Sequence, residues 1–357
     1  MVGEDTTSSA LEPAPLEPLS PALLTSDFLH STALRIIEAT WKSGLPQWSW
    51  GEGVYLLAEV RYREIAQAPF PQPLSGWFNQ WKEVTSGHVN NVAPGAAALR
   101  LSALGKINSL SIENQIETWL SNPSSVTISE FGAIEHWPGS VWADTCYMWG
   151  QYRLHSAITK SDTSHLDEVG RQLSAHIKHL FSEESGLFAH GSYQGKTLWN
   201  FWGRGNAWMA LAMVEFLDAC TLLNHLSPDH SRIIEVLEKQ LTSLRQLQPE
   251  YGIWDVLVDG QVENRGVIET SASAGIGAAM LRASRHLHSS RAEIEESGAL
   301  AIRAALSYVD SEGVLTRTSA GTVLQLIPFG YSVIRSDRLQ LWGQGLALNA
   351  IAALMQS

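Results

Sequence analysis

One carboxylate in the sequence has the surroundings that a proton donor needs. Asp144 lies between apolar and aromatic residues at the start of an apolar helical segment. Its neighbours Trp142 and Tyr147 are expected to exclude water, and desolvation raises the pKa of a carboxyl group towards neutral pH. The alternative is a helix N-cap, because an aspartate before an apolar helix is a common start signal. Asp144 is therefore the first candidate for acid catalysis, and Trp142 is a candidate for contact with substrate.

Two further candidates lie close together in sequence and suit an acidic sugar. His190 lies in a loop bounded by Gly186 and Gly191, where its imidazole could bond a substrate hydroxyl or carboxylate. The alternative for His190 is a solvated loop histidine. Arg204 lies in a frame of glycine and aromatic residues, and its planar guanidinium matches a carboxylate bidentately; the alternative is a structural salt bridge. Trp208, four residues on, would share a helical face with Arg204 and offer a stacking surface.

Other polar residues at the loops before helices are weak candidates when taken singly. They are His88, Asn90, Thr270 with its neighbour Ser271, and Gln344. No set of His and Cys residues has the spacing of a zinc site, and no glycine-rich loop opens a strand-to-helix unit that would bind phosphate. We therefore expect neither a metal nor a nucleotide cofactor.

The elements that position these residues are predicted to be helices. Apolar residues recur at intervals of three and four along most of the chain. The segments with this pattern are 28–41, 95–105, 145–158, 165–181, 207–224, 231–245, 270–287, 293–308 and 341–355. At six junctions a loop rich in Trp, Gly or Asn runs directly into a helix rich in Ala, Leu and Met: near Trp50, Asn90, Asp144, Arg204, Thr270 and Gly343. Each interval between junctions fits one helical hairpin.

Six hairpins closed in a ring predict an all-α fold, the (α/α)6 barrel or toroid. In this arrangement the starts of the inner helices converge on one end, so their polar residues surround a common pocket. The alternative is an irregular helical solenoid without closure. Residues 1–25 are rich in Pro, Ser and Thr and are expected to form a flexible N-terminal arm, followed by a single catalytic domain over residues 26–357.

The composition excludes several classes of partner. Hydrophobic residues make up 45% of the 357 residues, and charged residues make up 17%, which is enough for a large core. The formal net charge of −12 disfavours binding to nucleic acid, and no apolar stretch is long enough to cross a membrane. Residues 1–25 lack the features of a secretory signal, and Cys146 and Cys220 lie in apolar helical runs, so a cytoplasmic location is expected.

The sequence contains 14 tryptophans, and many of them lie beside glycine. These are Trp48, Trp50, Trp77, Trp81, Trp137, Trp142, Trp199, Trp202 and Trp342. Aromatic faces stack on the C–H faces of sugar rings while the indole N–H can still donate a hydrogen bond, so the tryptophans suggest a wall that binds carbohydrate. The alternative is that they only pack large helices together.

The motifs around the candidate residues resemble those of the unsaturated glucuronyl and rhamnogalacturonyl hydrolases of glycoside hydrolase families 88 and 105. Residues 142–148 look like the family's Trp-Val-Asp-Thr-Leu-Tyr-Met segment, and residues 186–191 look like its Gly-Leu-Tyr-x-His-Gly segment. Residues 201–208 are similar to its Trp-Ala-Arg-Gly-Asn-Gly-Trp segment, and residues 251–254 and 269–273 resemble its Gly-Leu-Trp and Glu-Thr-Ser pair. The family's fold is the (α/α)6 barrel, which agrees with the junctions above.

The resemblance also implies a reaction and roles for residues. The substrate would be the 4,5-unsaturated uronic acid that lyases leave at the non-reducing end of oligosaccharides. Asp144 would protonate C4 and then take a proton from the water that adds at C5. Arg204 would hold the uronate carboxylate, His190 would bond near it, and Trp208 would flank the sugar. Asn90 stands where the family often has a second aspartate, so repulsion between like charges cannot raise the pKa of Asp144 from that position.

Two alternative functions are compatible with the same toroid. A sugar epimerase would be expected to have paired histidines on inner helices, and an inverting glycosidase needs two separated carboxylates; neither set is evident in the sequence. The other alternative is a carbohydrate-binding toroid without turnover, which the amide of Asn90 favours. The sequence carries no signal for an oligomeric state.

Overall fold

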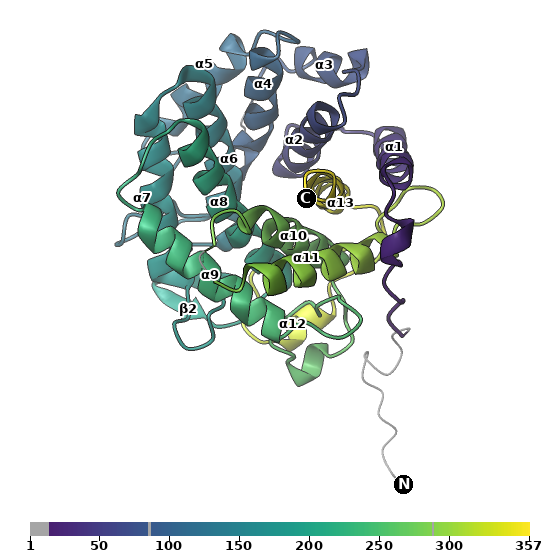
Figure 1. Ribbon diagram of the computed structural model, residues 1–357. Helices are drawn as coiled ribbons and strands as arrows, with labels where there is room; N and C mark the ends of the chain where they lie inside the picture. Colours follow the sequence, from purple (N-terminus) through teal and green to yellow (C-terminus); the bar gives the residue numbers. More distant parts are fainter. Residues whose placement is uncertain (1–13, 85–86, 288) are drawn as a thin grey trace.

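The computed structural model describes residues 14–84, 87–287 and 289–357, and these are mostly helical. Within these residues, six helices form an inner ring in chain order. They are α2 (Trp50–Ile65), α4 (Ala93–Ala103), α6 (Ala143–Lys160), α8 (Gly203–Leu222), α10 (Thr270–Ala283) and α13 (Leu341–Leu354). Each inner helix contacts the next one, and α13 returns to contact α2, which closes the ring (Figure 1). The predicted (α/α)6 toroid is confirmed, and each inner helix begins within three residues of a predicted junction.

The remaining long helices form an outer layer around this ring (Figure 1). They are α1 (Ser26–Ser43), α3 (Gln72–Asn79), α5 (Leu110–Leu120), α7 (Thr163–Leu180), α9 (His230–Gln246) and α11 (Arg291–Leu306). Helices α5, α7, α9 and α11 each pack on the inner helix that precedes them, and α1 packs on α13. In α7, Leu166, Val169 and Leu173 fall on one buried face, because their spacing matches the helical repeat. The outer helices therefore shield a ring that is itself largely buried.

Glycines allow the inner helices to approach closely. A Cβ atom on Gly53 of α2 would lie 2.6 Å from the backbone nitrogen of Pro94 in α4. A Cβ atom on Gly345 of α13 would lie 3.0 Å from the Cα atom of Tyr55 in α2. Such distances are too short for any other residue without movement of a backbone, so these glycines set the spacing of α13, α2 and α4.

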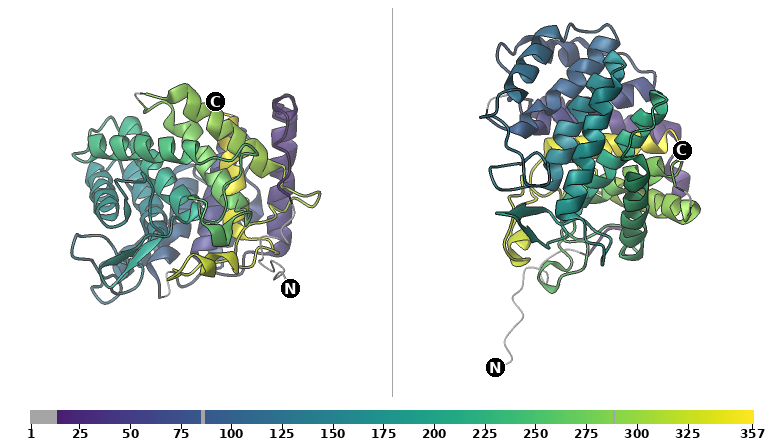
Figure 2. Two further views of the ribbon diagram at one scale, coloured as in Figure 1. Left: turned by 90° about the horizontal axis from the view of Figure 1, so that it is seen from below. Right: turned by 90° about the vertical axis from the view of Figure 1, so that its left-hand side faces the viewer.

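The loops before the inner helices form one end of the toroid. Two short antiparallel strands, β1 (Gly191–Tyr193) and β2 (Lys196–Leu198), lie at the same end as the short helix α12 (Phe329–Ser332), as Figure 2 shows. The 3-10 helices η3 (Val89–Val92) and η4 (Val262–Asn264) also belong to these loops. The amide nitrogens of Asn200 and Asn264 donate hydrogen bonds to the backbone oxygens of Gln325 (2.9 Å) and Pro328 (3.1 Å), which ties the segment before α12 to its neighbours.

The start of the described chain is attached to the outer layer. The backbone N–H of Leu16 donates a 2.7 Å hydrogen bond to the hydroxyl of Tyr308, and Leu19 and Arg303 exchange two hydrogen bonds. The turn η2 (Pro21–Leu23) then leads into α1. Residues 1–13 of the expected arm lie outside the described residues. Among the helices of the described chain, none is both long and apolar enough for a bilayer crossing.

Candidate active site

A cavity of about 380 Å³ lies at the end of the toroid where the inner helices begin. Four of the predicted site residues line it: His88, Asn90, Trp142 and Asp144. The rest of its wall comes from Ser49, Trp50, Asn91, His136, Trp137, Gly321, Thr322 and Val323. Residues from distant parts of the chain therefore meet here because the helix starts converge, as the toroid predicts.

Asp144 is the acid of this cavity. It is the second residue of α6, and its side chain is only 16% exposed. Desolvation raises the pKa of Asp144 from 3.8 to about 6, although hydrogen bonds from its own backbone N–H and from Asn90 act in the opposite direction. The Oδ1 atom has no hydrogen-bond partner among the described residues. Asp144 thus has one oxygen held by Asn90 and one buried oxygen without a hydrogen-bond partner among the described residues.

Asn90 restrains the other oxygen of Asp144. Its Nδ2 donates a 3.0 Å hydrogen bond to Oδ2 of Asp144. The backbone N–H of Asn90 donates to Nδ1 of His88 at 3.1 Å, which fixes the η3 turn beside α6. The Oδ1 of Asn90 is buried and has no partner within the described chain. Asn90 therefore orients the acid without adding charge to the cavity.

Two histidines beside Asp144 form a pair of neutral rings. The rings of His88 and His136 lie 4.4 Å apart, and His136 stacks on Trp142 at 3.9 Å. Burial lowers the pKa of His88 to about 4 and that of His136 to about 3. The Nδ1 of His136 lies 2.7 Å from the hydroxyl of Thr145 and 3.7 Å from Oδ2 of Asp144. His136 was not among the residues predicted from the sequence, although it lies in the loop that opens the junction before α6.

His190 lies behind the wall of the cavity. Its side chain is fully buried, its Nδ1 lies 2.8 Å from the hydroxyl of Tyr331, and its ring contacts Trp142 and Trp202. Burial lowers the pKa of His190 well below its usual value, so the ring is neutral. Its Nε2 has no partner in the part of the chain that is described. Tyr331 is separated from His190 by 141 residues, and no local signal in the sequence points to this contact.

Arg204 is enclosed by protein and is only 1% exposed. Its Nη1 donates to Oε2 of Glu269 at 3.3 Å and to the backbone and side-chain oxygens of Ser319 at 3.0 and 2.8 Å. Its Nη2 donates to the backbone oxygen of Ala320 at 2.9 Å and to the hydroxyl of Thr322 at 3.2 Å. The structural salt bridge that was the alternative expectation for Arg204 is therefore present. The loop at residues 319–322 separates the guanidinium from the cavity.

Trp208 does not reach the cavity. It is 1% exposed and stacks on Tyr147 with ring centroids 4.8 Å apart, inside the ring of helices. Trp208 lies one helical turn after Arg204, as expected from the sequence, but that turn carries it down the axis of the toroid, away from the helix starts. The expected stacking of Trp208 on a sugar is not possible in this arrangement.

The side chains of Thr270 and Gln344 form hydrogen bonds that hold the starts of α10 and α13 to the segment at residues 315–316. The hydroxyl of Thr270 donates a 2.7 Å hydrogen bond to the backbone oxygen of Thr316, and Gln344 accepts one from the backbone N–H of Leu315 at 2.8 Å. Both side chains are fully buried, so neither contributes to the cavity wall. Within the described residues, no group of three or more His, Cys, Asp or Glu side chains could hold a metal ion.

The tryptophans separate into two groups. Trp50, Trp137 and Trp142 line the cavity, and Trp137 is 52% exposed there. Trp48 and Trp77 instead stack on each other 5.5 Å apart within the core. Helix packing is therefore the role of Trp48 and Trp77, whereas Trp50, Trp137 and Trp142 form part of the cavity wall, and the binding of carbohydrate there stays a prediction.

A closed ring of paired helices, with a desolvated carboxyl group in a cavity at one end, defines a six-hairpin glycosidase fold. The sequence pattern of glycosyl hydrolase family 88 matches residues 29–357, and the chain belongs to this family. The unsaturated rhamnogalacturonyl hydrolase YesR of Bacillus subtilis is 30% identical to it over 223 residues, which are 62% of this chain and 61% of that protein. The aligned region therefore spans about three fifths of this relative.

Solved structures share the fold over nearly the whole chain. A possible member of the GH105 family from Salmonella enterica is 22% identical, with a TM-score of 0.79 over 96% of this chain and 99% of that one. The unsaturated glucuronyl hydrolase from Bacillus sp. GL1, described as responsible for glycosaminoglycan degradation, is 14% identical, with a TM-score of 0.66 over 91% of this chain and 96% of that one. At these identities the structures establish the fold alone.

Proposed function

We propose that this chain is a hydrolase that removes a 4,5-unsaturated uronic acid from the non-reducing end of oligosaccharides. The observation that carries the proposal is Asp144, a single desolvated acid with a pKa of about 6 in the cavity of a family 88 toroid. The name of the relative from Bacillus subtilis supports the same substrate class. An acid with such a pKa is present in both protonation states near neutral pH, as a group that donates and then accepts a proton requires.

In the proposed reaction, one carboxyl group serves twice. The proton of the Asp144 carboxyl group moves to C4 of the unsaturated ring, and the electrons of the C4–C5 double bond form the new C–H bond. This leaves an oxocarbenium-like centre at C5, to which a water molecule adds while its proton returns to Asp144. The resulting hemiketal opens and releases the remaining saccharide. Asn90 holds Oδ2 through its amide, which keeps the carboxyl group of Asp144 in one orientation.

The neutral rings around Asp144 support this role. His88 and His136 carry no charge near pH 6 because burial lowers the pKa of each. They help to exclude water from the acid, and they can donate a hydrogen bond to a sugar hydroxyl. Trp137 and Trp50 offer faces on which the sugar rings can stack.

Arg204 can bind the carboxylate of the uronate only after the loop at residues 319–322 releases its guanidinium. Its guanidinium makes hydrogen bonds to the loop at residues 319–322, and the same loop lines the cavity at Gly321 and Thr322. We propose that the substrate carboxylate replaces the loop oxygens as the partner of Arg204 when the sugar enters. His190 would act beside it, since its Nε2 is free of protein partners among the described residues.

A non-catalytic carbohydrate-binding toroid is the second candidate, and Asn90 is the observation that favours it. Ultraviolet absorbance of the unsaturated uronate separates the two functions, because hydration destroys the conjugated double bond and binding does not. The proposed hydrolase lowers this absorbance with lyase-generated oligosaccharides, whereas an epimerase or a binding protein leaves it unchanged.

The proposed location is a reducing compartment such as the cytoplasm. It is supported by Cys146 and Cys220, which are both buried as free thiols.

A further inference from the structure

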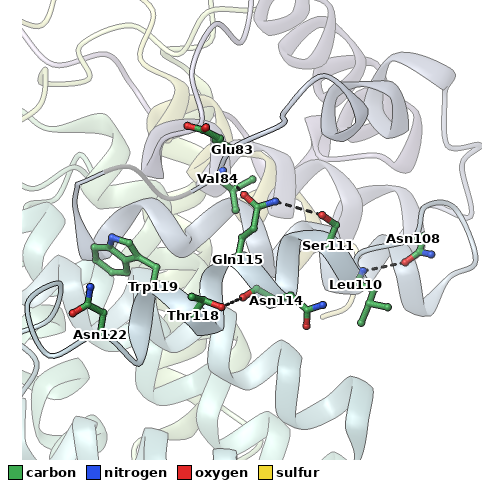
Figure 3. Close-up of a pocket in the computed structure, with 10 residues that line it drawn as sticks. All are labelled: Glu83, Val84, Asn108, Leu110, Ser111, Asn114, Gln115, Thr118, Trp119 and Asn122. Carbon is green, nitrogen blue, oxygen red and sulfur yellow. Dashed lines mark hydrogen bonds between the residues drawn. The ribbon is translucent and has the colours of Figure 1, made fainter.

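A second hollow lies on the outer surface, and it shares no lining residue with the cavity at Asp144. Its volume is about 980 Å³, and it runs along helix α5 beside the segment at Glu83 and Val84 (Figure 3). Six neutral polar side chains line it: Asn108, Ser111, Asn114, Gln115, Thr118 and Asn122. Trp119 completes the wall near Asn122. We call this hollow the α5 groove.

The exposed face of α5 is uncharged, unlike that of another outer helix. The exposed residues of α5 are Leu110, Ser111, Asn114 and Thr118. Helix α9 instead exposes a series of charged residues, which are Arg232, Glu235 and Lys239. Charged side chains usually cover the solvent side of such helices, so the neutral surface of α5 suits contact with a neutral polar molecule.

The groove presents amide donors that the protein does not use. The Oδ1 atoms of Asn108 and Asn122 accept hydrogen bonds from the backbone N–H groups of Leu110 and Ser124, both at 3.0 Å. These bonds fix the two side chains, while their Nδ2 atoms donate to no partner in the described part of the chain. The side chain of Asn114 likewise has no partner among the described residues. Three amide groups along one groove are thus available to an outside molecule.

We propose that the α5 groove binds a neutral saccharide at a site separate from the catalytic cavity. Amide donors match the oxygens of sugar hydroxyls, and the indole of Trp119 offers an apolar surface for a ring. The lining holds no Lys, Arg or His, and Glu83 carries the same charge as a uronate, so neutral rings fit the groove better than uronates or phosphates. The choice of a saccharide rests on the proposed function, because a hydrolase that acts on oligosaccharides works on material derived from polysaccharides.

The test uses affinity electrophoresis of the Asp144→Asn protein in gels that contain galactan, arabinan or polygalacturonate. We expect retardation by at least one of the two neutral polysaccharides. The variant Asn114→Ala/Thr118→Ala, made in the same background, should bind about tenfold more weakly, because two hydrogen bonds are lost. Both residues are exposed and alanine favours helices, so folding is preserved. The control is Ser231→Ala/Glu235→Ala on the exposed face of α9, which should not change the retardation.

Equal retardation of the groove variant and its parent would overturn the inference. Retardation by polygalacturonate alone, or by none of the gels, would also overturn it. The failure of the proposed function is a separate result. The groove variant could lose retardation while the unsubstituted protein fails to hydrate the unsaturated uronate. That pair of results would reject the proposed hydrolase, but it would support the saccharide site in the α5 groove.

Discussion

Asp144, Asn90 and the two neutral histidines illustrate how residues set the chemistry of this cavity. Burial is the main cause of the raised pKa of Asp144, and the one side-chain hydrogen bond that it accepts comes from an uncharged amide. A carboxylate at position 90 would add repulsion between like charges, whereas the hydrogen bond from the amide lowers the pKa of Asp144. The pH dependence of the enzyme is therefore expected to follow the desolvation of one acid.

The first prediction concerns the pH profile of kcat/KM. Because Asp144 donates a proton in the proposed reaction, activity should fall as pH rises through about 6, and at higher pH by about tenfold per unit. Asn90→Asp should move this decline to higher pH, since a second carboxylate disfavours ionisation of the first. Steady-state kinetics on one unsaturated disaccharide measures both profiles. A decline that stays in place in the variant would contradict the assignment of Asp144 as the titrating acid.

The second prediction concerns stability. The pKa of Asp144 is about 6 in the folded chain, against 3.8 for an unperturbed aspartate, so the folded state binds more protons between these pH values and loses stability as pH rises through this window. The loss amounts to about 3 kcal/mol above pH 6. Asp144→Asn should therefore raise the free energy of unfolding at pH 8, and the gain should vanish below pH 4. Urea unfolding at the two pH values checks this, and a gain that is equal at both would contradict it.

The third prediction concerns Arg204, whose removal leaves the fully buried Glu269 without its cation. Arg204→Ala should destabilise the fold by about 3–5 kcal/mol, in addition to any loss of substrate binding. The double variant Arg204→Met/Glu269→Gln should recover most of this stability, because no charge is left unpaired. Thermal unfolding of the single and double variants is the measurement, and a double variant no more stable than Arg204→Ala would disprove the role of the pair.

At the scale of elements, the close contact of α2 with α4 and α13 holds the helix starts together. The fourth prediction follows from Gly53, where a Cβ atom would meet the backbone of Pro94 at 2.6 Å. Gly53→Ala should cost about 1–3 kcal/mol of stability, because a backbone must move. Gly150→Ala in α6 is the matched control, since nothing lies within 4 Å of its added Cβ, and it should stabilise the helix by about 0.5–1 kcal/mol. Similar midpoints of urea unfolding for both variants would rule out this role of Gly53.

Some helices and contacts could be predicted from local sequence patterns, and others could not. Each inner helix is preceded by a loop rich in Trp, Gly or Asn and is itself rich in small residues, so the helix starts could be predicted closely. Helix α5 is absent from the periodic segments, because only Ile112 and Ile116 are buried along its length. The enclosure of Arg204 by residues 319–322 joins positions more than a hundred residues apart, so no local pattern could predict it.

At the scale of the whole molecule, closure of the ring converts separate motifs into one site. The contact of α13 with α2 brings Trp50 and the loop at residues 321–323 to the same cavity as Asp144. The four predicted residues at the cavity instead come from the neighbouring segments at the starts of α4 and α6, where η3 contacts α6. Trp208 does not reach the cavity because it lies one turn further along α8 and faces the packed interior of the ring.

The proposed hydration of an unsaturated uronate by Asp144 can be followed directly by ultraviolet absorbance. Lyase-generated unsaturated disaccharides are incubated with the protein and, separately, with its Asp144→Asn variant. We expect a steady fall in absorbance with the unsubstituted protein and almost none with the variant, which should still fold. Constant absorbance with both proteins across disaccharides of different composition, or an equal fall with both, would contradict the proposed role of Asp144.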